Sequence, residues 1–253
     1  MILKFIFVYY QMIIIASCIS AIVEVIATHP IDYIKTEKQK DRHFTFKNKK
    51  PFDFYTGITP RLLGVIPMRC LFWSSQSSIN NYLKINNIEH KLNFLYIGTG
   101  CACTQTLIDS PIENIKMKLL AGEKVKPKHL LNCKGFAPNL YRNMVFASIF
   151  SYFSYSEKIR NTKETFLFSL IGGLSGSILS QPLDYVKTIK QQTYKSYYKT
   201  TLISDMSTIN MIKYFIKVNP KQLFVGGFYR TLLSGCSMSI GFCVFNYFTP
   251  LNI

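Results

Sequence analysis

Long apolar segments alternate with basic ones along the whole chain. The first apolar segment, Phe5 to Ala27, carries a single charge, Glu24, in more than twenty residues. A helix of that length can cross a hydrocarbon core of about 30 Å. A signal peptide would instead have a shorter apolar core before a soluble domain, and the rest of this chain is not soluble in character. The pattern therefore predicts a helical membrane protein.

A six-residue pattern of proline, acid and lysine occurs three times in the same context. The copies begin at Pro30, Pro111 and Pro182. The acid follows two residues and the lysine five residues after each proline, giving Asp32 and Lys35, Glu113 and Lys116, and Asp184 and Lys187. Each copy closes an apolar segment rich in small residues, which let membrane helices approach closely, and we expect each proline to bend its helix. The chain therefore contains three repeats.

A glycine follows each basic stretch and opens a second apolar segment of about 25 residues. These glycines are Gly57, Gly135 and Gly226. Three repeats of two spans predict an all-α membrane protein of six transmembrane helices with both termini on one side. We divide the single domain 1–253 into repeats of about 1–86, 87–162 and 163–253.

The connection between proline and glycine differs in length from repeat to repeat. It covers 27, 24 and 44 residues in the first, second and third repeats. Only the third has room for an amphipathic helix, which we expect around Leu202 to Lys217. Such helices should be reduced in repeats 1 and 2.

Composition narrows the choice of partners and chemistry. The net charge of +17 comes from Lys and Arg between the apolar segments, on what would be one side of a membrane, so anionic lipid is a better partner than nucleic acid. Seven cysteines without a CxxC pair indicate free thiols, and no histidine stands at ligand spacing from Cys101 or Cys103, so no metal is expected. The absence of HExxH, P-loop and GxSxG motifs argues against an enzyme, and no cofactor is implied.

The three proline-acid-lysine copies, each followed by its glycine, resemble the signature of the mitochondrial carrier family. The resemblance implies a multi-pass protein of the mitochondrial inner membrane, or of a related organelle, with six tilted helices around a threefold pseudo-axis and a central cavity. In the family the charges pair between repeats, which would join Asp32 to Lys116, Glu113 to Lys187, and Asp184 to Lys35 at a matrix gate. Gln39 and Gln191 occupy the family's brace positions. Pairing within each helix is the alternative.

The outer gate departs from the family pattern. The family places an aromatic residue, an acid and a base near Gln76, Ser154 and Phe245, but the charges are missing in repeats one and three. Repeat two offers Glu157 and Arg160, three residues later than expected. Either groups such as Gln76 and Asn246 form hydrogen bonds there, or the protein no longer cycles normally.

Substrate contacts in the family fall seven and eight residues after each glycine. Here they are Gly64 and Val65, Arg142 and Asn143, and Leu233 and Ser234. A lone arginine at mid-membrane depth needs an anion, solvent or an acid, and the fork of Arg142 matches a carboxylate or a phosphate. The segments around Arg142 and Arg69 resemble family members that carry dicarboxylates, tricarboxylates and oxo acids.

Three other charged residues in these helices have more than one interpretation. Arg69 either contacts the substrate or reaches toward water or a lipid head group. Arg61 and Arg230 are expected to be structural or to face lipid. Glu24 would suit a zwitterionic substrate, neutralise Arg142 or couple a proton.

We therefore expect alternating-access transport of a small anionic metabolite, a di- or tricarboxylate or an oxo acid, with exchange or uniport left open. Carriage of S-adenosylmethionine, an amino acid or a nucleotide is one alternative, and a non-transporting scaffold is another. The resemblance also implies a monomer with cardiolipin near Gly57, Gly135 and Gly226.

Overall fold

The computed structural model describes residues 2–40, 50–88, 91–120, 135–155, 161–191, 197–198, 201–202, 206–224 and 226–249. Within these ranges, the side chains of residues 2–9, 35–40, 60, 113–120 and 191, and those of the two short strands, lie outside the description.

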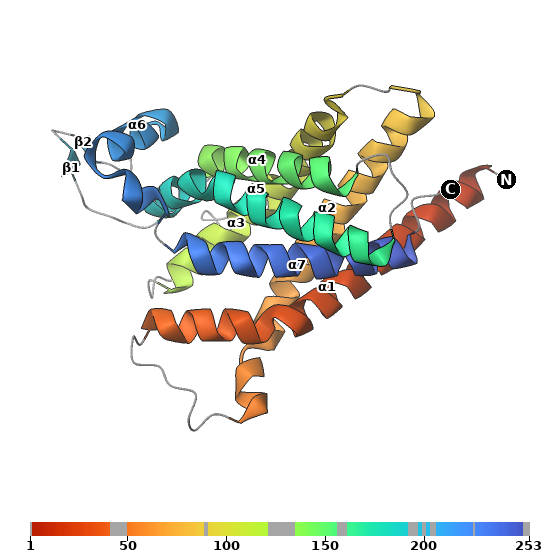
Figure 1. The fold of residues 1–253 in the computed structure, drawn as a ribbon, viewed down its shortest axis with the longest axis horizontal. Coiled ribbons are helices and arrows are strands. Elements are labelled where there is room, and N and C mark those ends of the chain that lie inside the picture. Colours follow the sequence, from red (N-terminus) through yellow and green to blue (C-terminus); the bar gives the residue numbers. More distant parts are fainter. Residues whose placement is uncertain are drawn as a thin grey trace.

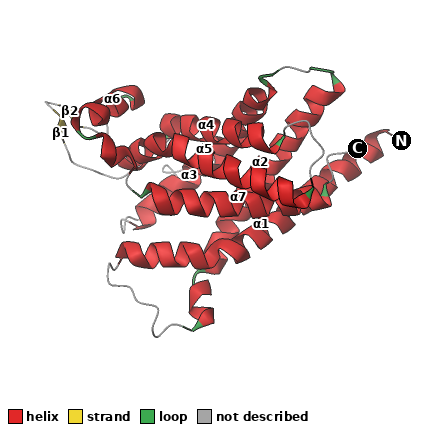
Figure 2. Cartoon of the chain, viewed as in Figure 1, coloured by secondary structure: helices red, strands yellow, loops and turns green. Residues whose placement is uncertain are grey.

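The described residues are mostly helical, as expected (Figures 1 and 2). The six long helices are α1 (Ile2–Lys40), α2 (Ile58–Ile85), α3 (Asn93–Leu120), α4 (Phe136–Ser154), α5 (Thr162–Gln191) and α7 (Gly227–Phe248). The shorter elements are η1 (Pro51–Tyr55), α6 (Thr208–Val218), η4 (Pro220–Phe224) and the antiparallel strands β1 (Tyr197–Tyr198) and β2 (Thr201–Leu202).

The six long helices form a closed ring. Each packs on the next in chain order, and α7 packs on both α5 and α1. Small residues allow this approach: a Cβ added at Gly173 of α5 would lie 3.1 Å from Cα of Gly235 on α7. The small-residue segments therefore serve close helix contact, as the sequence predicted.

The three repeated prolines lie inside α1, α3 and α5 and do not end them. Helix α1 runs ten residues beyond Pro30, and Figure 1 shows it changing direction along its length. The apolar segments close at these prolines, as the sequence indicates, but the helices themselves continue into the basic stretches. Neighbouring helices and polar side chains can satisfy the carbonyl that a proline leaves without a partner.

The three repeated glycines cap α2, α4 and α7 in the left-handed conformation. Gly57, Gly135 and Gly226 have φ values of 82°, 83° and 74°. This region costs glycine little and other residues more. The prediction that the second helix of each repeat starts at this glycine is confirmed.

Helix α6 supplies the expected amphipathic segment of the third repeat. It spans Thr208–Val218, starting six residues after the expected Leu202, and buries Met211 and Phe215. The hydroxyl of Ser207 accepts a hydrogen bond from the backbone N–H of Asn210 and so caps the helix. The connections of the first two repeats, residues 41–49 and 121–134, lie outside the described residues.

Three of the described segments are long and apolar enough to cross a membrane: Tyr10–Ile34, Thr162–Lys190 and Pro220–Phe248. Helices α2, α3 and α4 carry buried or half-buried polar side chains such as Arg69, Asp109 and Arg142, which lower their mean hydropathy. Their outward faces are apolar, with Leu63 72% and Leu107 64% exposed. Exposed large apolar side chains suit contact with lipid.

A cluster of aromatic rings fills the centre of the ring at one level. Trp73 of α2 is fully buried and lies 5.6 Å from Phe242, 5.5 Å from Phe245 and 5.8 Å from Phe150 between ring centroids. We call Phe72, Trp73, Phe150, Phe242 and Phe245 the aromatic cluster. It joins α2, α4 and α7.

Candidate substrate cavity

A cavity of about 260 Å³ lies inside the helix ring. Its lining comes from α1, α2, α3, α4 and α7: Glu24, Arg61, Val65, Met68, Arg69, Gln105, Asp109, Arg142, Leu233, Ser234 and Ser237. Three arginines and two acids among these residues make it polar and positively charged on balance. Such a site suits a small anion.

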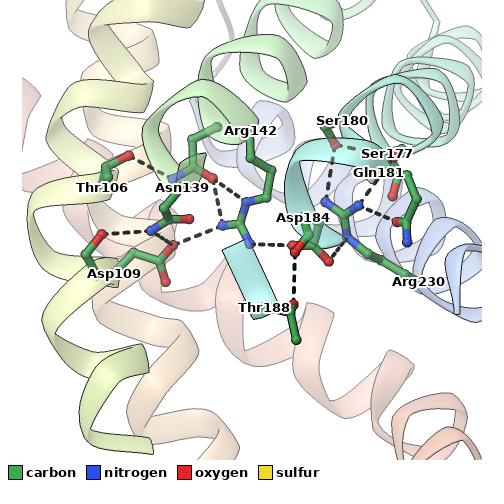
Figure 3. Close-up of polar contacts among 12 residues, drawn as sticks. Thr106, Asp109, Asn139, Arg142, Ser177, Ser180, Gln181, Asp184, Thr188 and Arg230 are labelled. Carbon is green, nitrogen blue, oxygen red and sulfur yellow. Dashed lines mark hydrogen bonds and ion pairs between the residues drawn. The ribbon is translucent and has the colours of Figure 1, made fainter. Parts of the chain in front are cut away.

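Arg142 of α4 lines this cavity and lies between Asp109 and Asp184 (Figure 3). Its Nη2 lies 3.0 Å from Oδ2 of Asp109 on α3, and its Nη1 lies 3.0 Å from Oδ1 of Asp184 on α5. The guanidinium therefore bridges two carboxylates from helices on either side of α4. Asp184 also forms an ion pair with Arg230 of α7, whose Nε lies 3.4 Å from Oδ2 of Asp184.

Neighbouring amides fix this cluster in place. Asn143 accepts bonds from Nε and Nη2 of Arg142 and donates to the Thr106 hydroxyl at 2.9 Å. Asn139 donates to Oδ2 of Asp109 at 3.3 Å. Asn143 is buried and is not among the lining residues, so it orients Arg142 and does not itself face the cavity.

Glu24 of α1 forms a second buried ion pair, with Arg69 of α2. Nε and Nη2 of Arg69 donate to the carboxylate at 2.6–3.0 Å, and the hydroxyl of Ser237 on α7 donates to the same carboxylate. Arg69 therefore points into the protein. The reading in which it reaches toward lipid head groups is wrong, and Glu24 is neutralised by Arg69 in place of Arg142.

Arg61 and Arg230 were expected to be structural or lipid-facing, and both turn inward. Arg61 lines the cavity and lies 3.3 Å from Asp32. Arg230 donates to Gln181 at 2.6 Å as well as contacting Asp184. The structural reading holds for both side chains, and the lipid-facing one is wrong.

These contacts repeat from one helix pair to the next. The residue four positions after each capping glycine bonds to the two polar residues just before the repeated proline. Arg61 contacts Thr28 and His29, Asn139 contacts Asp109 and Ser110, and Arg230 contacts Ser180 and Gln181.

The cavity contains most of the substrate-contact residues that the sequence predicted. Val65, Arg142, Leu233, Ser234, Glu24 and Arg69 line it, whereas Gly64 and Asn143 do not. Sequence reasoning did not place the other five lining residues in the site: Arg61, Met68, Gln105, Asp109 and Ser237. Asp109 could have been found, because an acid inside an apolar segment is as informative as Glu24.

The predicted matrix-gate pairs stay predictions. Each of the three pairs includes a side chain outside the described residues, namely Lys35, Glu113 or Lys116. The side chains of the predicted braces, Gln39 and Gln191, also lie outside the description. The described gate acids, Asp32 and Asp184, contact the arginines of the second helices. Lys187 is buried.

The predicted outer-gate positions lie beside the aromatic cluster. Gln76 is fully buried and donates to the Ser151 hydroxyl at 2.9 Å, and Phe245 belongs to the cluster itself. In the described part of the chain, the Ser154 hydroxyl and the Asn246 Oδ1 are buried without a hydrogen-bond partner. Glu157 and Arg160 lie outside the described residues.

The described cysteines carry free thiols, and Sγ of Cys18 contacts Sγ of Cys70 at 3.3 Å. Among the described residues, no cluster of three histidine, cysteine or acidic side chains could hold a metal ion.

Residues 9–87 match the family model described as "Mitochondrial carrier protein". The "probable mitochondrial 2-oxodicarboxylate carrier" of Schizosaccharomyces pombe is 28% identical over 214 residues, which cover 68% of this chain and 71% of the relative. The mitochondrial 2-oxodicarboxylate carriers of Mus musculus and Bos taurus are each 25% identical, over 67% and 69% of this chain and 71% and 73% of their own lengths. With its apolar helices, the chain is a multi-pass protein of the mitochondrial inner membrane. By these matches, the repeated signature and the polar cavity, the chain is similar to proteins of the mitochondrial carrier family.

Proposed function

We propose that this chain carries an oxo-dicarboxylate across the mitochondrial inner membrane by alternating access. The observation that carries this assignment is Arg142, a cation inside the cavity that already holds two carboxylates, Asp109 and Asp184. A guanidinium binds carboxylates with two parallel donors, so a substrate carboxylate can replace either acid in the same geometry. The relatives named as 2-oxodicarboxylate carriers support the same class of cargo.

The cavity favours a small dianion over the alternatives. In this structure Glu24 is paired with Arg69 and accepts from Ser237, so it offers no open carboxylate to the cationic group of an arriving amino acid or S-adenosylmethionine. A volume of about 260 Å³ lies below the range of roughly 300–1,000 Å³ that is usual for drug-sized ligands. A nucleotide is therefore a poor fit.

The architecture that serves this transport is six spans in three equivalent pairs. The repeated contact between the second helix of each pair and the residues before its proline supports a threefold relation of α1–α2, α3–α4 and α5–α7. The repeats follow the boundaries of about 1–86, 87–162 and 163–253. The protein acts as a monomer with cardiolipin at Gly57, Gly135 and Gly226, and it transports its cargo without chemical change.

At the matrix gate, Asp32, Glu113 and Asp184 exchange partners as the cavity opens and closes. Asp32 lies 31% exposed and 3.3 Å from Arg61, and transfer to Lys116 would close the matrix end. Exposed ion pairs are worth only about 0–1 kcal/mol each, so substrate binding can open such a ring. Reversing the charge of Lys116 should abolish transport, and also reversing Asp32 should restore part of it.

Uptake into liposomes that contain the purified protein tests the function. Labelled 2-oxoadipate should enter with saturable kinetics, and unlabelled dicarboxylates should compete better than nucleotides or amino acids. Arg142→Ala should lose this uptake. The matched control is Tyr141→Leu, next to Arg142 on the same helix but 46% exposed, which should transport normally.

Two results would count against this function. Saturable 2-oxoadipate uptake that survives in Arg142→Ala would remove Arg142 from the site. Vesicles that exchange no carboxylate, nucleotide or amino acid would favour the non-transporting scaffold.

A further inference from the structure

We infer that a proton binds Glu24 when the substrate binds, because the substrate's second carboxylate takes Arg69 from Glu24. This inference rests on the proposed function and assigns Arg69 and Glu24 as the coupling pair of the same site. It follows from the way in which the cavity's cations are occupied.

Each arginine that lines the cavity already has a carboxylate from the protein. Arg61 contacts Asp32, Arg69 contacts Glu24, and Arg142 contacts Asp109 and Asp184. A dianion must therefore displace protein carboxylates from two of these cations. Arg142 can accept the first substrate carboxylate in place of Asp184, which keeps Arg230, and can itself keep the buried Asp109.

The position of α7 identifies Arg69 as the second cation. Ser237 contacts both Arg69 and Glu24, and it lies one helical turn beyond Leu233 and Ser234, which line the same cavity. Arg61 instead contacts Thr28, His29 and Asp32 near the proline of α1. A dicarboxylate held by Arg142 and by the α7 wall therefore meets Arg69.

Displacing Glu24 has a different consequence from displacing Asp32 or Asp184. The Glu24 side chain is only 3% exposed, whereas Asp32 and Asp184 are 31% and 22% exposed. A buried carboxylate without a counter-charge is costly, and in proteins it takes up a proton instead. The proton enters from cavity water, and the neutral acid can then donate to the Ser237 hydroxyl.

The surroundings of Glu24 hold few other charges. From α2 it faces Arg69, and Arg61 lies close enough for their charges to interact. From α7 it faces Ser237 and Gly241, where an added Cβ would lie 2.8 Å from Oε2. Among the described side chains around it, His29 beside Arg61 is the group to exclude as a second proton acceptor.

Homo-exchange of 2-oxoadipate in liposomes, with equal pH on both sides, tests this step. Model carboxyl groups titrate near pH 4, so the substrate stays dianionic between about pH 6.5 and about pH 8. If one proton binds with the substrate, the KM of the wild type should increase as the pH increases, by up to about tenfold per pH unit. In Glu24→Gln the KM should not vary with pH, whereas His29→Gln should keep the wild-type slope.

A direct count of protons does not depend on the variant. Calorimetric titration of the wild type with 2-oxoadipate, in buffers of different ionisation enthalpy, should give about one proton taken up per substrate. No proton uptake by the wild type, or a Glu24→Gln variant that keeps the full pH slope, would overturn the inference and leave 2-oxoadipate transport intact. No binding or exchange of 2-oxoadipate at any pH would overturn the proposed function as well.

Discussion

Replacing Arg142 with alanine should destabilise the protein as well as stop transport. The side chain of Asp109 is 4% exposed and has Arg142 as its ion-pair partner, whereas Asp184 keeps Arg230. Removing one partner of a buried pair costs about 3–5 kcal/mol. At about 2–4 °C per kcal/mol for a chain of this size, the Tm should fall by on the order of 10 °C.

A second substitution separates the buried charge from the lost contact. In Arg142→Ala with Asp109→Asn, residue 109 is neutral and its side-chain oxygen can still accept the bond from Asn139 that Asp109 receives now at 3.3 Å. We expect the double variant to regain most of the lost Tm in detergent and to remain without 2-oxoadipate uptake. The single variant Asp109→Asn serves as the control, because Arg142 keeps Asp184.

The opposite outcome is equally informative. If the double variant melts no higher than Arg142→Ala, the cost arises from lost packing of the long arginine side chain and not from the buried charge of Asp109. The double variant also gives the transport test a well-folded form that lacks Arg142.

Three further substitutions test the fold and the outer end of the cavity. Trp73→Ala removes a fully buried ring from the aromatic cluster and should lower the unfolding free energy by about 3–5 kcal/mol, seen as a lower Tm. It should also open the outer end of the cavity, so that thiol reagents label a second substitution, Val65→Cys, faster than in the protein with Trp73. Gly57→Ala should cost about 1–2 kcal/mol through its positive φ of 82°, because an added Cβ would meet no other atom within 4 Å. A modest fall in Tm with normal transport would check this. Gly173→Leu should lower the unfolding free energy by about 1–3 kcal/mol, because the added side chain pushes α5 away from Gly235 on α7. A melting curve unchanged from that of the wild type would contradict this close packing.

Repetition made much of this fold accessible from the sequence. Three prolines and three glycines at matching places gave the number of long helices, and a left-handed N-cap admits few residues other than glycine. The ends of the first helices were not predictable in the same way. A proline ends a helix in water more readily than in a bundle, where neighbouring helices satisfy the open carbonyl, and this explains why α1 continues past Pro30.

Within the site, the positions were easier to predict than the partners. Counting seven or eight residues from each glycine, as the family resemblance implies, placed Arg142, Val65 and Leu233 in the cavity. Which acid pairs with which arginine depends on helix rotation and on side chains from other repeats. Glu24 therefore contacts Arg69, and Arg142 contacts Asp109, whereas neutralisation of Arg142 by Glu24 was one of the interpretations that the sequence left open.

The two ends of the cavity are held by different forces. Toward the repeated prolines, the described contacts are ion pairs such as Asp32 with Arg61, which are partly exposed and individually weak. Toward the outer end, the contacts are the buried rings around Trp73 and the bond from Gln76 to Ser151. Buried aromatic rings therefore fill the end of the cavity at which the resemblance would place an outer gate of charges. Gly241 lies where the two regions meet, since an added Cβ would lie 2.8 Å from Oε2 of Glu24 and 3.4 Å from the Trp73 ring.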